Sequence, residues 1–549
     1  MTLMTNIQKR FAVLLFSLCA SAVQAHDHDA AATAAVETLG EVDFPVTCIP
    51  AAQTEFNRAM ALLHSFWYSP AQASFATVLE LDPECGMAHW GLAFASMGNP
   101  FTWSSNPGAA KLGAVHAQLA HNTGANSARE RDYIAAQGIF FHNWQTVSFA
   151  QRVADYVRAM TSLAERYPQD DEAKILQALA INFDIDPADK TFAKQSQAMA
   201  ILEPLFVKYP RHPGIAHYVI HTNDYSELAT RALPAARTYA GIAPSVPHAL
   251  HMPSHIFSRV GLWPDMVTSN RASYNAARAE LDAATLTLGN YNALHAMDYM
   301  LFAHLQQAQD RAAQAILEET QAIKKIQVEN FAAAYALAAI PARFALERKD
   351  WPQAAALTLS PADMGWEKFP QAESILVFAR GLGAARSGDI DAARSSVARL
   401  QTLNDQMRAA NLGYWPTQTD IQIQAVDAWI AFAEGQPDVA LGLMRAAATA
   451  EDASDKHPVT PGNVVPSREL LGDMLLELQQ PAAALNEYVR SLQRDPNRYH
   501  GLSGAARAAA ASGNNHLARE YFTQLQAQTV DSDSARPELA EARRFFAAQ

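Results

Sequence analysis

Apolar residues along most of the chain recur at spacings of three and four, and the segments that carry them are rich in Ala, Leu, Gln, Glu and Arg. This spacing puts the apolar side chains on one face of a helix, and those residue types have high helix propensity. No segment of the sequence shows the sustained alternation that a half-buried strand requires. The pattern therefore predicts an all-α protein.

One spacing recurs along the chain: a small residue, a bulky residue four positions later, a third residue three positions after that, and a proline five positions further on. It occurs at Ala71, Phe75, Val78 and Pro83, at Ala198, Leu202, Leu205 and Pro210, and at Ala484, Tyr488, Ser491 and Pro496. The spacing is typical of tetratricopeptide (TPR) repeats, helical hairpins of about 34 residues. The small residue lets two helices approach closely, and the proline ends the second helix. We therefore expect a TPR-type α-solenoid, a superhelix of antiparallel helical hairpins.

Turn-rich and Pro-rich segments divide this pattern. The expected parts are a signal peptide (1–25), an extended strap (26–50), an N-terminal TPR-like solenoid with a His-rich groove (51–345), middle TPR-like repeats (346–453), a Pro-rich insertion loop (454–467) and C-terminal TPR repeats (468–549). Lys456 and His457 begin the insertion loop. This loop is expected either to fold over the groove as a lid or to lie on the surface.

The first residues are typical of a cleaved secretory signal peptide. Lys9 and Arg10 precede a short apolar run, and small residues follow up to a cleavage site after Ala25. The run is shorter than the roughly 20 apolar residues that a membrane span needs. We therefore expect a periplasmic or secreted protein without a transmembrane segment. Cleavage after Ala25 would place His26 and His28 beside a free α-amine. These groups would either chelate Cu²⁺ or Ni²⁺ or form part of a solvated tail.

Removal of the signal peptide leaves two cysteines, Cys48 and Cys85. In an oxidising compartment the simplest expectation is a disulfide between them. Two buried free thiols and a paired-thiolate metal site are the less favoured alternatives.

The charge balance argues against one class of partner. The chain has 55 Asp and Glu against 42 Lys and Arg, a formal net charge of −13, and its sequence has no basic stripe. Binding to phosphate backbones needs clustered Lys and Arg, so we expect no nucleic-acid partner. The sequence also lacks a Gly-rich phosphate loop, a nucleophile elbow and a dinucleotide fingerprint.

Histidine is the informative excess. In a TPR solenoid the first helix of each hairpin lines the concave groove. The repeat register predicts that three consecutive hairpins place one set of candidate metal ligands in this groove: His217, His221, His248, His251, His255, His295 and Asp298. His64 is also expected to face inward.

Two pairs within this set have the spacing His-x-x-x-His, which lets two imidazoles on one helical face bind one ion. They are His217 with His221 and His251 with His255. Imidazole suits Zn²⁺, Cu²⁺ and Fe²⁺, and the spacing does not choose among them. The alternative is that inward histidines are ordinary hydrogen-bonded residues. Pro253, inside the second pair, predicts a kink or a helix start that would move His248 and His251 into a loop.

Several longer strings carry a resemblance to a known group of proteins. They are LHSFWY (63–68), DPECGMAHWG (82–91), HYVIH (217–221), PHALHMPSHIF (247–257) and KHPVTPG (456–462). Through them most of the chain resembles a group of large exported bacterial TPR-containing proteins, and its C-terminal third resembles ordinary TPR domains. The resemblance implies the fold and export, and it implies no activity.

Two functions from different classes remain. The first is an exported TPR scaffold whose concave groove binds a peptide, a partner protein or a small molecule, with any metal structural or carried as cargo. The alternative is a metal-dependent enzyme, hydrolytic with Zn or oxidative with Cu or Fe, that uses the groove histidines as ligands. In that case Asp298 or Asp224 would be the base or would orient an imidazole. We prefer the binding function.

Overall fold

The computed structural model describes residues 37–99, 101, 106–186, 189–279, 281 and 288–548. The expected signal peptide, the cleavage site after Ala25 and the pair His26 and His28 lie outside the described residues. Thr38–Gln549 forms one compact unit. The internal boundaries expected at 345, 453 and 467 stay predictions.

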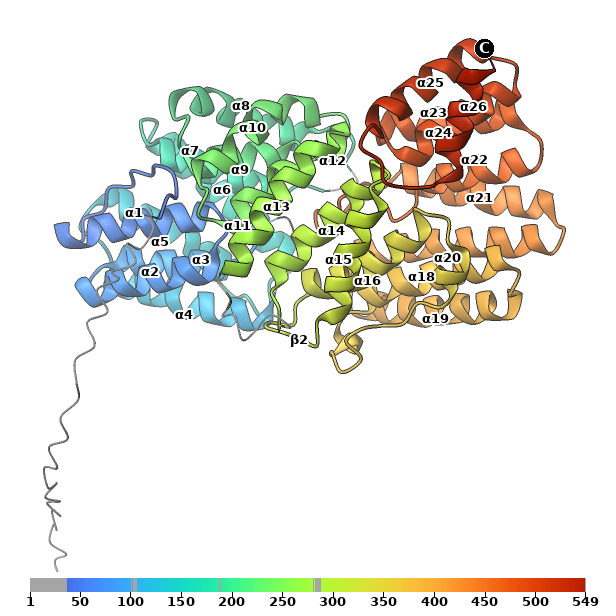
Figure 1. Ribbon diagram of the computed structural model, residues 1–549. Coiled ribbons are helices and arrows are strands. Elements are labelled where there is room, and N and C mark those ends of the chain that lie inside the picture. The colour runs from blue at the N-terminus through green and yellow to red at the C-terminus, as the bar shows by residue number, and fades with distance from the viewer. Residues whose placement is uncertain are drawn as a thin grey trace, which may run out of the picture. The chain divides into compact units, whose positions relative to one another are not determined.

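In the first half of this unit the described residues form thirteen α-helices that pack on their neighbours in sequence, with a 3-10 helix at Ala229–Ala232 (Figure 1). Their bounds are α1 (Pro50–His64), α2 (Tyr68–Leu81), α3 (Gly86–Ala95), α4 (Pro107–Thr123), α5 (Ala128–Phe141), α6 (Phe149–Arg166), α7 (Asp171–Phe183), α8 (Ala193–Lys208), α9 (Pro213–Thr222), α10 (Leu233–Ile242), α11 (Pro247–His251), α12 (Pro253–Val260) and α13 (Trp263–Ala279).

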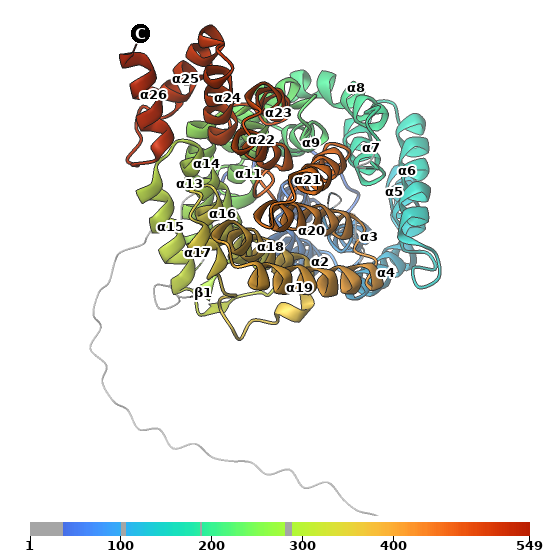
Figure 2. The same ribbon diagram turned by 90° about the vertical axis from the view of Figure 1, so that its right-hand side faces the viewer.

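The second half continues the same arrangement of hairpins (Figure 2). Its helices are α14 (Tyr291–Gln306), α15 (Asp310–Ala322), α16 (Phe331–Leu346), α17 (Trp351–Ala355), α18 (Pro370–Ser387), α19 (Ile390–Ala409), α20 (Tyr414–Ala433), α21 (Pro437–Asp452), α22 (Ser467–Glu477), α23 (Pro481–Arg494), α24 (Tyr499–Ala511), α25 (Asn515–Gln528) and α26 (Pro537–Ala547). The all-α, TPR-type solenoid is confirmed. None of the helices in the described ranges has both the length and the apolar character needed to cross a membrane.

The repeat residues lie where the spacing predicts. The small, bulky and third positions of all three matches are buried on the second helix of a hairpin, in α2, α8 and α23. Tyr488 on α23 shows why the neighbouring positions are small. A Cβ added to Gly472 on α22 or to Gly504 on α24 would collide with the Tyr488 ring. The glycines therefore allow three helices to close around one aromatic side chain.

Two short strands were not anticipated. β1 (Leu288–Gly289) pairs in parallel with β2 (Lys325–Ile326), beside the start of α14 and the end of α15. Each strand has only two residues, which is too short for an alternating pattern to be recognised in the sequence.

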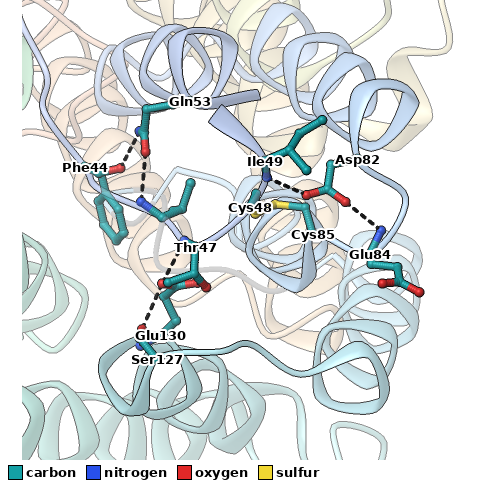
Figure 3. The surroundings of a disulfide bond; sticks show 11 residues. Phe44, Thr47, Cys48, Ile49, Gln53, Asp82, Glu84, Cys85, Ser127 and Glu130 are labelled. Atoms are coloured by element: carbon teal, nitrogen blue, oxygen red, sulfur yellow. Dashed lines mark hydrogen bonds between the residues drawn. A yellow bond between two sulfur atoms is a disulfide. The ribbon is translucent and has the colours of Figure 1, made fainter. Parts of the chain in front are cut away.

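The expected disulfide is present. Cys48 in the N-terminal strap is bonded to Cys85, which precedes α3, with the two Cα atoms 5.1 Å apart (Figure 3). Beside it, the backbone N–H and the hydroxyl of Thr47 donate to the two carboxylate oxygens of Glu130 at 2.9 and 2.8 Å. The backbone N–H of Ile49 donates to Asp82 at 2.8 Å. The strap is thus fixed to α3 and α5 by covalent and polar contacts.

Two large hydrophobic clusters meet at α14. Tyr299 and Phe302 on this helix belong to the cluster formed with the strap and α1–α13. Leu294 and Leu301 belong to the cluster that continues through α16–α24. This helix also carries His295 and Asp298, so the candidate ligands lie at the boundary between the two clusters.

Candidate metal centre

Six histidines that the sequence singles out come together in two groups of three. His217 and His221 come from α9, His248 and His251 from α11, His255 from α12 and His295 from α14. These helices belong to three successive hairpins, as the repeat register predicts. We call His217, His221 and His248 the first triad, and His251, His255 and His295 the second triad. Within each triad the candidate ligand atoms lie within 4.8 Å of one another.

The proline between His251 and His255 changes the helix but not the alignment of the two rings. α12 begins at Pro253, and Met252 before it has helical dihedrals, φ −52° and ψ −37°. Proline is tolerated at a first helical position because its missing N–H has no partner there. His251 therefore lies on the short helix α11 rather than in a loop, and its ring meets that of His255.

In the first triad, Nε2 of His217 lies 3.2 Å from Nε2 of His248. The ring of His221 lies 4.8 Å from that of His217 between centroids and stacks on Phe101 at 3.9 Å. The Nε2 atom of His221 is buried and has no hydrogen-bond partner among the described residues. Buried polar atoms are normally paired, so this nitrogen is a candidate ligand atom.

The second triad also has two Nε2 atoms in close contact. Nε2 of His251 lies 3.1 Å from Nε2 of His255, and the ring of His295 lies 4.3 Å from that of His251. The ring of Tyr299 packs against all three imidazoles, at 4.6 to 5.4 Å between centroids. His251 and His255 are buried, whereas His295 is half-buried, as His248 is in the first triad.

Three of the rings are oriented by oxygen atoms outside the triads. Nδ1 of His217 donates to the backbone carbonyl of His64 at 2.7 Å. Nδ1 of His251 donates to Oδ1 of Asn270 at 2.6 Å. Nδ1 of His255 donates to Oδ2 of Asp224 at 2.9 Å. In a neutral imidazole with its proton on Nδ1, the lone pair is on Nε2, which here faces the other histidines.

Burial keeps these imidazoles neutral. It lowers the pKa of five of them well below the usual 6.5, and in each case neighbouring imidazoles lower the pKa further; they are His217, His221, His248, His251 and His295. Burial also lowers the pKa of His255, against the opposing effect of the Asp224 carboxylate. The neutral form is the one that binds metal.

Asp224 connects the second triad to the insertion loop. Besides the proton of His255, its carboxylate accepts hydrogen bonds from Arg259 at 2.8 Å and from Lys456 at 3.0 Å. Although burial raises the pKa of Asp224, the charges of Lys456 and Arg259 hold it well below its usual range. Asp455 in the same loop pairs with Arg259 at 2.8 Å. Asp224 therefore orients an imidazole, one of the two roles that the sequence leaves open for it.

The insertion loop between α21 and α22, which we call the lid, is buried against side chains that surround the triads rather than exposed on the surface. Lys456 and His457 are both buried. Arg343 on α16 donates to Thr460 at 2.7 Å and to the carbonyl of Gly462 at 2.9 Å, and Tyr299 donates to the carbonyl of Pro458 at 3.2 Å. Between this loop and His221 lies a cavity of about 20 Å³. That is room for one water molecule.

Asp298 is placed differently from the other candidates. Its side chain is fully buried, and Oδ1 accepts a hydrogen bond from Arg343 at 2.9 Å. Burial raises its pKa, against the opposing charge of Arg343. Asp298 is not among the residues of either triad. In the structure it holds Arg343, which in turn holds the lid.

A third group of possible ligands has a complete set of hydrogen bonds. Glu172 accepts from Nε2 of His64 at 3.2 Å and from Nε2 of His212 at 2.9 Å. Nδ1 of His64 contacts the Tyr218 hydroxyl at 2.8 Å, and Nδ1 of His212 accepts from the backbone N–H of Ile215. The sequence predicted that His64 faces inward, but not that it lies beside Glu172 and His212. Because every ring nitrogen here has a partner, this group is explained as a structural network.

Sequence reasoning also missed Asn270, Arg259 and the contact of Lys456 with Asp224. Asn270 lies on α13, the second helix of its hairpin, and Lys456 is 232 residues from Asp224. The repeat register describes only neighbouring helices. The available signal was local, namely the position of Asp224 three residues after His221.

Comparisons with known proteins add no chemistry. No known protein family and no curated protein sequence matches the chain. Among solved structures, a human IFIT1 dimer with PPP-AAAA is similar at 11% identity and a TM-score of 0.37, covering 80% of this chain and 90% of that one. A structure of Naa15/Naa10 bound to HypK-THB is similar at 12% identity and a TM-score of 0.23, covering 90% of this chain and 73% of that one.

Proposed function

We propose that the protein is an exported helical scaffold that binds transition-metal ions through its two histidine triads. The observation that carries the proposal is the facing Nε2 atoms of His251 and His255, 3.1 Å apart. In both neutral rings the single N–H is at Nδ1, where it donates a hydrogen bond. The Nε2 lone pairs of the two rings therefore point at each other. Such a contact is repulsive unless a cation lies between the nitrogens.

A proton is poorly suited to be that cation, because burial lowers the pKa of both rings. A metal ion fits the geometry. Two imidazole nitrogens bound to one tetrahedral ion at about 2.0–2.1 Å lie about 3.3 Å apart. The separations of 3.1 Å in the second triad and 3.2 Å in the first are close to that value. The Nδ1 partners are those of ordinary metal-bound histidines, a carboxylate, an amide and a backbone carbonyl.

The ligand set points to Zn, Cu or Fe rather than to Mg or Ca. Imidazole suits the first three ions, whereas Mg²⁺ and Ca²⁺ are bound by oxygen. Each triad offers three nitrogens, so a fourth position is left for a water-sized ligand, in keeping with the small cavity beside His221.

Binding is better supported than catalysis. The two carboxylates that the sequence offers as a base for metal-activated water both form ion pairs with buried cations, although Oδ2 of Asp298 has no hydrogen-bond partner among the described residues. Asp224 is paired with Arg259 and Lys456, and Asp298 is paired with Arg343. A peptide, protein or small-molecule ligand elsewhere in the groove stays a prediction.

Export is part of the proposal. The Cys48–Cys85 disulfide is typical of an oxidising compartment. The sequence resemblance to exported bacterial TPR proteins points to the same place, the periplasm or the exterior.

The test is elemental analysis of the mature protein, purified from its native compartment without an affinity tag. It is run beside the double variant His217→Ala/His251→Ala and beside a control variant, His89→Gln/His116→Gln. His89 and His116 pack against each other outside the triads, with their Nδ1 atoms 3.4 Å apart. We expect stoichiometric metal in the wild type and in the control, and its loss in the double variant. Absence of metal from the folded wild type, or equal metal in all three, would contradict the proposal.

A further inference from the structure

Resting on the proposed metal binding, we infer that the two triads form one binuclear copper centre, with two ions close enough to share a bridging ligand. The alternatives are a single ion that uses some of the six imidazoles, and two ions that bind independently.

A single helix supplies both triads. His248 belongs to the first triad and His251 to the second, and both lie on α11. Residues three apart on a helix rise by about 4.5 Å and lie on the same side. The two ligand sets are therefore separated by less than one helical turn.

The ring separations between the triads fall within the range found inside them, which runs from 4.3 to 6.5 Å in the second triad. The ring of His221 lies 5.7 Å from that of His255, and the ring of His248 lies 6.3 Å from that of His251. Within the second triad, His255 and His295 are 6.5 Å apart. The six imidazoles thus form one continuous cluster with two ligand sets. Two ions held in it lie within the range of a shared small ligand, as in other two-metal sites, whose ions are about 3.5–4 Å apart.

The charge of the surroundings favours copper. Both triads consist of neutral imidazoles. The carboxylates around them are balanced by cations, Asp224 and Asp455 by Arg259 and Lys456, and Asp298 by Arg343. Two divalent ions would bring four uncompensated positive charges into a buried site, which is costly. Two Cu⁺ ions bring half that charge, and imidazole is a suitable ligand for copper. When dioxygen takes one electron from each Cu⁺, a bridging hydroxide, formed from water whose proton leaves to the solvent, lowers the charge of the Cu²⁺ pair.

The experiment measures total copper and paramagnetic copper in the same samples. All proteins carry His26→Gln and His28→Gln, because a free α-amine beside these histidines would also bind Cu²⁺. The metal-free protein is loaded with Cu⁺ without oxygen, freed of unbound copper and then oxidised. Elemental analysis gives copper per chain, and electron paramagnetic resonance (EPR) gives the spins per copper.

We expect two copper ions per chain, with an EPR signal well below the total copper because two bridged Cu²⁺ ions pair their spins. His217→Ala should remove one ion from the first triad, and His295→Gln should remove one from the second. In both variants the remaining copper should give its full EPR signal. The control His89→Gln/His116→Gln should behave as the wild type, and circular dichroism checks that each variant is folded.

The inference and the proposed function fail in different ways. Two ions with the full EPR signal in the wild type would show independent sites and overturn the pair. One ion per chain, lost in either variant, would show a single site. Two zinc ions retained against copper in a parallel zinc loading would overturn the choice of copper alone. A folded wild type that binds neither metal would overturn the proposed function itself.

Discussion

The Nε2 atoms of His251 and His255 face each other at 3.1 Å, while the Nδ1 atoms of both rings donate to oxygen atoms of Asn270 and Asp224. The two nitrogens of each ring therefore differ in role. Nδ1 fixes the ring by its hydrogen bond, and Nε2 keeps an unshared lone pair. The predictions about the site follow from this division.

Asp224→Asn should weaken metal binding without removing a ligand. The carboxylate orients His255 and increases its basicity, and loss of such a partner typically costs about 10–100-fold in metal affinity. A competition titration against a chelator measures the change. Asp184→Asn, at a half-buried pair with Lys194 outside the triads, is the control and should bind as the wild type. Equal affinities of the two variants would argue against this role of Asp224.

The metal-free protein should lose stability as the pH falls below about 6.5. A histidine in the unfolded chain takes up a proton near the usual value of 6.5, whereas burial lowers the pKa of His217, His221 and His248 and keeps them neutral to lower pH. The unfolded chain therefore binds more protons, and the free energy of unfolding falls as the pH falls, by up to about 1.4 kcal/mol per pH unit for each such group. Urea unfolding at pH 7.5 and at pH 5.5 measures this change. A variant lacking these three histidines should show a smaller pH dependence.

Lys456→Met should speed the exchange of bound metal. The ammonium is buried against Asp224 and Arg259, and burial lowers its pKa to about 8. Breaking one partner of a buried ion pair costs about 3–5 kcal/mol, so the loop should open more often. Stopped-flow transfer of metal to a chelator measures the rate. Lys368→Met, at an exposed pair with Glu329, should leave the rate unchanged. The metal content of both variants should equal that of the wild type, since neither residue is a ligand.

The repeat packing can be tested with two glycines. Gly504→Ala places a Cβ against the Tyr488 ring and should destabilise the protein by about 1–3 kcal/mol. Gly442→Ala, in the interior of α21, meets nothing within 4 Å and should stabilise it by about 0.5–1 kcal/mol. Thermal unfolding of the two variants should give shifts of opposite sign. Shifts of the same sign would contradict the packing around Tyr488.

The sequence allowed the fold and most of the site to be predicted, because both depend on local periodicity. The register of Ala198 and Leu202 identifies the second helix of a hairpin, and from it the inward faces that carry His217 and His221 follow. The HxxxH spacing then brings each pair of rings together, even across Pro253.

The residues that orient the triads, and the loop contacts beside them, could not be predicted, because they depend on contacts that periodicity does not encode. Lys456 reaches Asp224 from a loop without a repeat register, and Arg343 reaches Asp298 and the same loop from α16. In a solenoid each hairpin contacts chiefly its neighbours, so contacts made by an insertion across the groove have no signal in the spacing. For the same reason Asp298, expected among the ligands, was not distinguished from a residue that holds an arginine.

The position of the lid along the chain has a consequence for the assembly of the protein. All the histidines of the two triads precede residue 291 or lie on α14, whereas Lys456 and the loop that contacts Asp224 and Tyr299 beside them come after α21. Polypeptides emerge from the N-terminus, and their earlier parts fold first. The segments that form the triads are thus synthesised before the loop that packs beside them. A metal ion that binds during this interval meets the imidazoles before the contact of Lys456 with Asp224 exists, and completion of the chain ends the interval.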